Sequence, residues 1–406
     1  MPWKGVVTVS EQRENFIRDY YLRYYSLWDL AERYSVSRKT AYKWIDRYEG
    51  QGREGLQDLS RRPHSCPWQT ERHIAEALVQ LRLAHPSWGP RKLLDILQRR
   101  HPQWDLPVVS TAAQILTHQG LVRCSRRHRR AHPGCPQSVA EEPNEVWGAD
   151  YKGQFRLGNG EYCFPQTVSD LASRYLLGCD AHAQICKDRT KAHFTRLFHL
   201  YDLPQRIRTD NGAPFASNAL GRLSELSVWF IKLGIYPELI EPGEPQQNGI
   251  HERMHRTLKQ ESTHPPARTL QLQQVKFDEF RREYNEQRPH EGIGMRRPAE
   301  VYYPSGRKMP KRIETYDYPP NALVRRVSRC GTIRVFGNQV FVSQTLNEEY
   351  VALEEVDDGM YDLFFCFYLI GRYELRANKI HDIISKVPMS RARADLPSRL
   401  LPMSPE

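Results

Sequence analysis

Three acidic residues in separate segments constrain the fold more than any other feature of the sequence. They are Asp150 in VWGADYKGQF, Asp210 in RIRTDNGAPF and Glu252 in PQQNGIHERMHRTLK. In-line displacement at a phosphodiester uses one divalent ion at the attacking oxygen and another at the leaving oxygen, and carboxylates hold such hard ions. A single carboxylate cannot hold two ions. The fold must therefore bring the three segments together if the acids act as one site.

The residues before two of these acids predict strands. Val146, Trp147 and Ala149 lead into Asp150 and Phe155 follows, which predicts a strand with an acid where an apolar residue could lie. Residues 206–208 predict a short strand that ends at Asp210. Acids at the carboxyl ends of strands lie where open α/β sheets place their sites. Two further strands are predicted at 162–168 and 175–179, and they complete an antiparallel meander with the first strand.

The third acid falls in a predicted helix. Arg256 and Lys259 follow Glu252 at the i, i+4, i+7 spacing of helical neighbours, so one face can carry a metal ligand and phosphate-binding cations. Apolar residues at every fourth position predict the buried stripe of this helix: Ile250, Met254 and Leu258.

Each acid also has a simpler explanation. Asn-Gly after Asp210 is a strong hairpin signal, so that segment could be a plain turn. Glu252 with Arg256 is the usual i, i+4 surface pair. Asp150 alone could be a buried acid that backbone donors satisfy. The occurrence of all three contexts in one order favours the catalytic interpretation.

These motifs resemble those of the DDE transposases and integrases, specifically bacterial insertion-sequence transposases with a retroviral-integrase-type core. The matching text is WGADYKG, RTDNGAPF, EPQQNGIHERMHRTLK and YNEQRPHEGIGMRRPAEVY, and the resemblance covers roughly residues 10–305. The last block often accompanies the acidic triad in that family, through Tyr284, Asn285, Arg288, Pro289, His290 and Pro298. Two departures are visible. Lys152 replaces a frequent Thr, and the longer spacing between the second and third acids suggests extra residues around 221–240.

The resemblance implies an RNase H-like core at residues 143–305 that cleaves and joins DNA strands at transposon ends. It implies two Mg²⁺ or Mn²⁺ ions held by Asp150, Asp210 and Glu252, and a contact between Lys259 and transposon-end DNA. The expected partners are the terminal inverted repeats, target DNA and further copies of the chain.

Charge agrees with a nucleic-acid partner. The 406 residues carry a formal net charge of +11, and the sequence pI is about 9.2. The expected linker at 123–142 opens with five arginines and no acid in its first eight residues. Even as a solvated linker, it would bind DNA phosphates by counterion release. The arginines assigned to that contact are Arg126, Arg127, Arg129 and Arg130.

Cysteines and apolar runs bear on the compartment. The eight cysteines form no CxxC pair, which is typical of a reduced compartment. An alternative is a zinc site in the linker, although its spacing is not that of a usual finger: Cys124, His128, His132 and Cys135. No apolar run approaches the ~20 residues that span a bilayer, and no signal peptide is evident. We expect a cytoplasmic, nucleoid-associated protein without a membrane partner.

Residues 10–60 predict a helix-turn-helix domain. Ser26 and Asp29 start a helix at 27–34 by capping-box logic, and Ser37 caps a second helix that runs to about residue 48. The second helix of such a unit enters the major groove. Four residues stay on its outer face as expected DNA contacts: Arg38, Lys39, Tyr42 and Lys43. The alternative is an ordinary αα-hairpin.

Two more domains are expected around the core. Residues 66–122 predict a second helical, winged-helix-like DNA-binding domain, with Thr70 as the first cap and a last helix that ends at Gly120. Residues 315–376 predict a small SH3-like β-barrel, and residues 377–406 a mobile tail. The predicted strands are 323–324, 332–336, 339–342, 350–353 and 363–369. The barrel could instead be a dimerisation module.

Taken together, the sequence predicts a multidomain α/β protein: helix-turn-helix units, an RNase H-like core with a mixed sheet, and a small C-terminal β-barrel. The favoured function is an active DDE transposase. The alternatives are a catalytically silent DNA-binding regulator with the same fold and a general RNase H-type nuclease. The two upstream helical units argue against the nuclease, because a non-specific nuclease needs no recognition domain.

Overall fold

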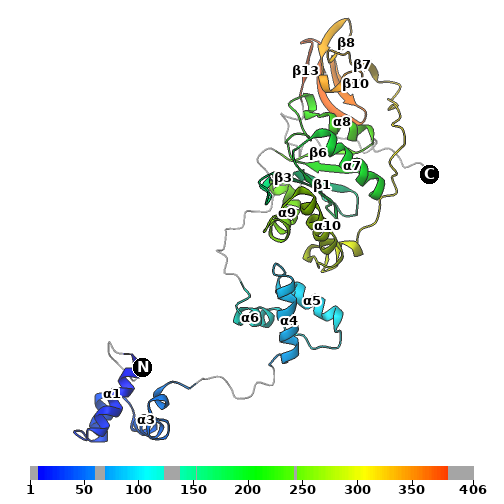
Figure 1. Cartoon of the computed structure of the whole chain (residues 1–406). Coiled ribbons are helices and arrows are strands. Elements are labelled where there is room, and N and C mark those ends of the chain that lie inside the picture. The colour runs from blue at the N-terminus through cyan, green and yellow to red at the C-terminus, as the bar shows by residue number, and fades with distance from the viewer. Residues whose placement is uncertain (1–7, 60–68, 123–137, 152, 242–244, 383–406) are drawn as a thin grey trace. The chain divides into compact units, whose positions relative to one another are not determined.

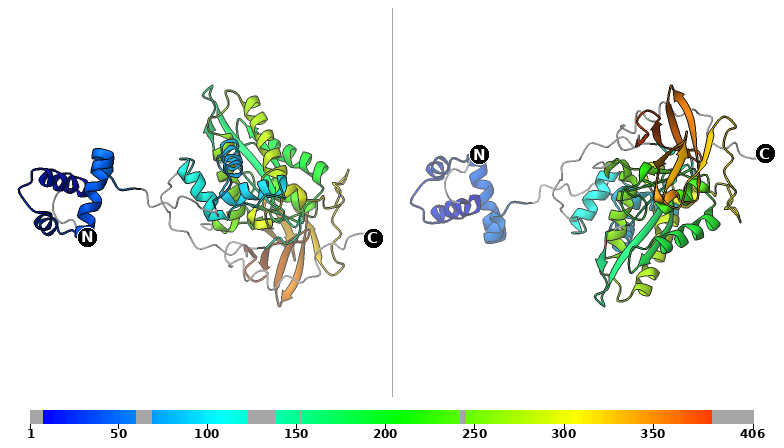
Figure 2. Two further views of the ribbon diagram at one scale, coloured as in Figure 1. Left: turned by 90° about the horizontal axis from the view of Figure 1, so that it is seen from below. Right: turned by 90° about the horizontal axis from the view of Figure 1, so that it is seen from above.

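The computed structural model describes residues 8–59, 69–122, 138–151, 153–241 and 245–382. The chain divides into two compact units, Met1–Gln69 and Thr70–Glu406. Figure 1 labels the elements of each unit, and Figure 2 shows them from two further directions. No helix in the described ranges is long and apolar enough to cross a membrane.

The first unit is a bundle of three helices, α1 (Val9–Tyr21), α2 (Leu27–Arg33) and α3 (Arg38–Gln51), closed by the 3-10 turn η1 (Gly52–Leu56). The predicted capping box is confirmed, because Ser26 and Asp29 cap α2 reciprocally. The sequence had not indicated α1, whose Phe16 packs in the core with Leu30 and Trp44.

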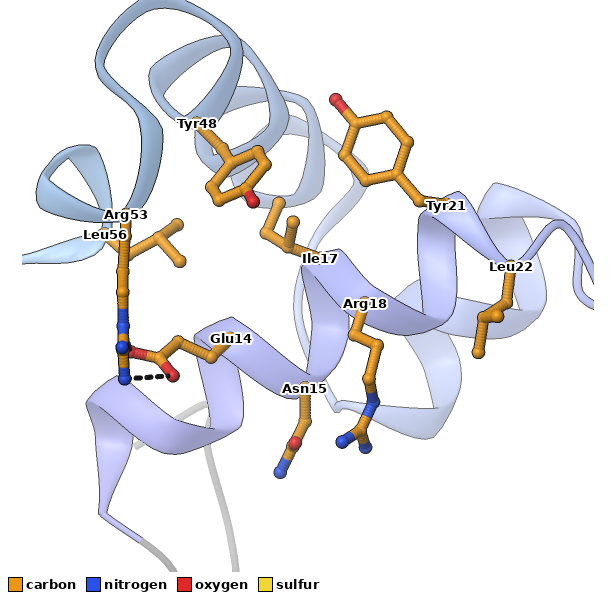
Figure 3. A pocket seen from close by; sticks show the side chains of 9 residues that line it. All are labelled: Glu14, Asn15, Ile17, Arg18, Tyr21, Leu22, Tyr48, Arg53 and Leu56. Carbon is orange, nitrogen blue, oxygen red and sulfur yellow. Dashed lines mark hydrogen bonds and ion pairs between the residues drawn. The ribbon is translucent and has the colours of Figure 1, made fainter.

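The surface of the first unit carries a hollow between α1 and α3 (Figure 3). Tyr21 and Tyr48 flank it, and Ile17 lies between them. At its other end, the Arg53 guanidinium forms two hydrogen bonds, of 2.8 and 2.9 Å, with the Glu14 carboxylate. This ion pair ties η1 to α1 and fixes the end of the helix-turn-helix domain.

The second unit begins with three helices, α4 (Arg72–Ala84), α5 (Pro90–Arg100) and α6 (Val109–His118). They pack around Leu78, Trp88 and Leu93. The prediction that Thr70 caps α4 is wrong, since Glu71 is the N-cap and its side chain makes no capping bond. Within the described range 69–122 there is no strand, so no wing forms there.

A six-stranded mixed sheet forms the centre of the second unit. Its strands are β1 (Val146–Tyr151), β2 (Phe155–Arg156), β3 (Tyr162–Asp170), β4 (Leu176–His182), β5 (Arg206–Thr209) and β6 (Tyr236–Leu239). Strands β1, β3 and β4 pair antiparallel, which confirms the predicted meander. Strand β5 lies between β1 and β6 and is parallel to both. The turn after Asp210 therefore does not join two antiparallel strands.

Helices cover both faces of this sheet (Figure 1). On one face α7 (Lys187–Tyr201) and α8 (Glu225–Lys232) bury Phe194, Phe198 and Phe230 against Trp147. On the other face α9 (Gly249–Ser262) and α10 (Leu270–Glu286) share a second cluster with β3 and β4, which contains Met254, Leu258, Phe277 and Cys163. Short 3-10 turns complete the fold: η2 (Leu220–Arg222), η3 (Pro245–Asn248), η4 (Glu291–Ile293), η5 (Pro298–Glu300) and η6 (Gln344–Leu346).

The C-terminal strands form two sheets. Five strands have the order β13-β12-β11-β10-β7, and β8 pairs only with β9. Their bounds are β7 (Leu323–Arg326), β8 (Thr332–Val335), β9 (Asn338–Phe341), β10 (Tyr350–Asp357), β11 (Met360–Phe365), β12 (Tyr368–Glu374) and β13 (Lys379–His381). Both sheets are open, so the predicted closed barrel is not confirmed.

Two predictions for this region are wrong. The single strand predicted at 363–369 is divided by Cys366, which has φ of 50° and turns the chain between β11 and β12. The segment predicted as a tail contains β13, whose Ile380 pairs with Tyr373 of β12.

Helix α8 joins the C-terminal sheet to the central sheet. Its residues Leu226, Trp229 and Phe230 belong to the cluster on the central sheet, whereas Val228 and Ile231 belong to the cluster of the C-terminal strands. The Lys232 ammonium also lies 2.7 Å from the Glu349 carboxylate.

Candidate active site

Asp150 and Asp210 lie on neighbouring parallel strands. The register of β1 and β5 pairs Val146 with Arg206 and Gly148 with Arg208. Continued by two residues, this register places Asp150 level with Asp210, one strand spacing of about 4.8 Å away. Asp150 is the next-to-last residue of β1, and Asp210 directly follows β5.

Side-chain hydrogen bonds of Asp210 and Asn211 hold the turn after Asp210 in place. The Gly212 amide donates to the Asp210 carboxylate at 3.1 Å. The Asn211 amide group donates to the Ile240 carbonyl at 2.7 Å, and Arg222 donates to the Asn211 oxygen at 3.0 Å. The turn is thus fixed to the end of β6, and Asp210 stays at the edge of the sheet.

The helix that carries Glu252 is attached to β3 by two buried histidines. Nε2 of His251 and Nε2 of His255 lie 2.8 and 2.6 Å from the Thr167 hydroxyl oxygen. The same hydroxyl oxygen lies 3.3 Å from the Asp150 carbonyl oxygen, so Thr167 links both imidazoles to the backbone at the first acid. His251 Nδ1 lies 2.8 Å from the Ser169 hydroxyl oxygen.

This attachment brings α9 to the first acid. His255 Nδ1 lies 3.7 Å from an Asp150 carboxylate oxygen. Glu252 lies three residues earlier on α9, and residues three apart on a helix are neighbours on its surface. Glu252 therefore lies on the helix whose His255 approaches Asp150.

Gly148 allows this close approach. A Cβ at this position would lie 2.9 Å from Leu171 Cδ2 and 3.1 Å from His251 Nδ1. Alternate residues of a strand face the same side, so Gly148 and Asp150 share the face that α9 covers. The glycine in WGAD is therefore a packing requirement of the site.

The predicted buried stripe of α9 needs correction. Met254 and Leu258 are buried as expected, but Ile250 is only partly buried, whereas His251 and His255 are buried. A stripe predicted from apolar residues alone does not include His251 and His255, because histidine is polar. Their i, i+4 spacing around Glu252 was the available signal.

A buried ion pair beneath the site was also missed. Arg208 donates to Glu238 of β6 at 2.8 Å, and both side chains are almost wholly buried. The same guanidinium donates to the Gln247 carbonyl, just before α9, at 3.2 Å. Arg208 thereby connects β5, β6 and the start of the helix that carries the third acid.

The donor atoms of the three acids suit hard divalent ions, because all are carboxylate oxygens. Within the described ranges, no Lys, Arg or His forms an ion pair with Asp210 or Glu252. Glu252 is exposed, and Asp210 is partly exposed. The residues present therefore fit a metal site, since no protein cation already neutralises these two carboxylates.

The acids do not form the tightest group of possible ligands. Among the described residues, that group is Asp180, His182 and His193, whose ligand atoms lie within 4.8 Å of one another. Arg196 already contacts both Asp180 oxygens, at 2.7 and 2.8 Å. Burial alone would raise the pKa of Asp180, but His193 and Arg196 together lower it to about 2. The Asp180 carboxylate is thus already paired with protein cations where a metal would bind.

The residues predicted to contact DNA are exposed where the structure describes them. Arg38, Lys39, Tyr42 and Lys43 lie on the outer face of α3, and Arg256 and Lys259 on the outer face of α9. Arg38 also stacks on the Trp28 ring at 3.7 Å. The predicted linker contacts, Arg126, Arg127, Arg129 and Arg130, and the alternative zinc ligands lie outside the described residues.

Models of known protein families match both the helical segments and the segment that contains the three acids. The integrase core domain is matched by residues 140–245 in one family model and by residues 233–298 in a second. Residues 12–64 match a helix-turn-helix domain and residues 40–116 a homeodomain-like domain. The chain is therefore similar to integrase core domains over residues 140–298 and to helix-turn-helix domains over residues 12–116.

Individual relatives are distant. A 39.2 kDa protein of insertion element IS476 from Xanthomonas euvesicatoria is 28% identical over 61% of this chain and 69% of its own length. The InsD transposase of IS2 from Escherichia coli is 25% identical over 56% of this chain and 79% of its own. The HTLV-2 integrase catalytic core domain, solved in complex with magnesium, is 16% identical over 40% of this chain and 98% of its own, with a TM-score of 0.32.

Proposed function

We propose that this protein is a DDE transposase that binds the ends of its mobile element and catalyses metal-dependent DNA strand cleavage and strand transfer. The observation that carries the proposal is the register of β1 and β5 together with the attachment of α9. These features support a single carboxylate site made of Asp150, Asp210 and Glu252.

Asp150, Asp210 and Glu252 would hold two Mg²⁺ or Mn²⁺ ions. When bound, such ions polarise the phosphodiester and lower the barrier for the attacking and leaving oxygens. Thr167, His251 and His255 position the helix that carries Glu252, and Asn211 holds the Asp210 turn. These contacts keep the carboxylates in one geometry before DNA arrives, which favours the in-line arrangement.

Separate surfaces would bind the DNA. The exposed outer face of α3 suits recognition of base edges in the major groove through Arg38, Lys39, Tyr42 and Lys43. On α9, Arg256 and Lys259 follow Glu252 on the exposed face and suit phosphates beside the scissile bond. We further propose that the protein acts as a homo-oligomer on the nucleoid, because two element ends must be joined to one target.

The test uses the full-length protein and DNA that flanks its gene, with Mg²⁺ or Mn²⁺. Asp150→Asn, Asp210→Asn and Glu252→Gln should each abolish cleavage and joining but leave DNA binding nearly unchanged, because an amide cannot supply the charge that holds two divalent ions. Asp180→Asn is the matched control, since its carboxylate is already paired with protein cations. Strand transfer by Asp150→Asn would exclude the assignment.

The runner-up function is a catalytically silent regulator derived from a transposase. It predicts the same DNA binding with no metal-dependent cleavage by the unaltered protein. The absence of a protein cation on Asp210 and Glu252, within the described residues, favours the active enzyme.

A further inference from the structure

A basic cavity lies in the second unit, between the helical segment and the first turn of α9. Its volume is about 280 Å³, comparable to roughly nine water molecules at ~30 Å³ each. It is formed by α5, by the turn between β3 and β4, by α9 and by the segment after α10. The residues that define its chemistry are Lys92, Arg174, Arg253, Tyr284, His290 and Glu291.

Positive charge predominates in this cavity. Lys92, Arg174 and Arg253 line it, against the single carboxylate of Glu291. That carboxylate also lies 3.6 Å from Arg91, outside the lining. The cavity therefore carries more positive charge than its own acid neutralises, and an anion would complete it.

Arg174 is the strongest single indication of a missing partner. Its Nη1 is buried and has no hydrogen-bond partner in the described part of the chain. The residue has φ of 66°, a left-handed backbone conformation that is uncommon outside glycine. Gly292 packs against the guanidinium, because a Cβ there would lie 3.5 Å from its Nη2. The fold thus holds a guanidinium in place without supplying an acceptor for Nη1.

The ionisation of neighbouring groups reflects the same excess charge. Burial, and then the nearby Arg288, lowers the pKa of Lys92 to about 8. Burial lowers the pKa of His290 to about 3, and the charges of Lys92 and Arg288 add to this effect. The protonated forms of Lys92 and His290 are therefore disfavoured, as expected where neighbouring positive charges have no anion beside them.

The cavity is linked to the catalytic helix. Ile250 and Arg253, which flank Glu252 on α9, both line it. Tyr284 and His290 come from the block that accompanies the acidic triad in sequence and that the carboxylate site does not use. Their rings lie 4.6 Å apart in an edge-to-face arrangement. Arg288 of the same block braces the wall, since it pairs with Glu261 and lies over the Trp88 ring.

We propose that this cavity binds a phosphate group of the DNA backbone and so holds the DNA against the first turn of α9. The inference rests on the proposed function. Guanidinium and ammonium groups are the usual phosphate ligands of proteins, and Arg174 offers a free donor. Lys92 comes from α5, so DNA in the cavity would contact the helical segment and the catalytic core at once.

The first test measures binding of the full-length protein to a duplex oligonucleotide over a range of salt concentrations, without divalent ions. Lys92→Gln and Arg253→Gln should each reduce the slope of log K against log salt by about 0.9, because one phosphate contact is lost. Arg282→Gln is the matched control, since Arg282 is exposed on α10 away from the cavity lining. Slopes for Lys92→Gln and Arg253→Gln that equal that of the control would overturn the proposal.

The second test uses the unaltered protein. The Lys92 amine is acetylated with a limiting reagent at pH 8 and quantified by mass spectrometry, with exposed Lys379 as the internal reference. A duplex should protect Lys92 relative to Lys379. No protection, or protection by inorganic phosphate alone and not by the duplex, would overturn the proposal. Neither test measures cleavage, so an inactive protein would refute the proposed function without changing these results.

Discussion

Gly148→Ala should separate the third acid from the other two. The new Cβ would lie 2.9 Å from Leu171 Cδ2 and 3.1 Å from His251 Nδ1, whereas ordinary contacts begin at 3.4 Å. The Leu171 side chain must therefore move by about 0.5 Å and His251 by about 0.3 Å, and both lie in the closely packed interior. His251 is wholly buried between Thr167 and Ser169, so its shift displaces the helix that carries Glu252.

The expected size follows from this overpacking. An added methyl group in a well-packed interior costs about 1–3 kcal/mol of stability. A displacement of about 1 Å at reacting groups can lower the rate about 100-fold. We expect Gly148→Ala to lose about 2 kcal/mol in urea unfolding and to cleave element-end DNA at least about tenfold more slowly in Mg²⁺.

Gly249→Ala is the matched control for this variant. Gly249 is the first residue of α9, and a Cβ there would meet nothing within 4 Å. It makes the same chemical change at the same helix without a clash, and should cleave at the normal rate. If Gly148→Ala unfolded and cleaved as the unaltered protein does, the contact between β1 and α9 would not position the site.

Four further outcomes are expected. Glu238→Gln should cost about 3 kcal/mol in urea unfolding because it leaves the buried Arg208 without its ion pair, and a loss below ~1 kcal/mol would contradict this role. The folded pKa of His290, about 3, lies below its usual value of 6.5, so the folded state binds fewer protons and stability should fall as pH drops from about 6.5 toward 3. His290→Gln should remove up to about 1.4 kcal/mol per pH unit of that decline, and an unchanged pH profile of unfolding would refute it. Lys259→Ala should slow strand transfer and reduce the salt slope of end binding by about one, whereas unchanged values would show a lysine that only faces solvent. Replacement of Arg38, Lys39, Tyr42 and Lys43 by Ala should weaken end binding, with relaxed specificity of about 1–3 kcal/mol at any base-edge contact, and normal binding by the fourfold variant would exclude α3 as the recognition helix.

The two strands with acids at their ends could be predicted because local patterns determine them. Apolar residues before Asp150 mark the first strand, and the short run of residues 206–208 before Asp210 marks the other. Ser26 and Asp29 likewise form a capping box from residues three apart. In such cases the residues that determine the element lie within a few positions of one another in the sequence.

The contacts that join these elements could not be predicted in the same way. His251 and His255 are buried because Thr167 and Ser169, more than 80 residues earlier, supply hydrogen-bond partners. Arg208 is buried because Glu238 lies opposite on β6. A polar residue that is satisfied by a distant partner appears solvent-exposed in a local pattern. The break at Cys366 was hidden for the opposite reason, since an unbroken apolar run continues through the turn.

Helix α8 packs its apolar residues against both the central sheet and the C-terminal strands. One side of it, with Trp229 and Phe230, completes the central sheet, and another, with Val228 and Ile231, completes the C-terminal strands. Unfolding of either sheet would expose apolar residues of the same eight-residue helix to water. The central sheet and the C-terminal strands should therefore unfold in one cooperative step. A fragment that ends at residue 305 would leave Val228 and Ile231 of α8 exposed to solvent and would be prone to aggregation.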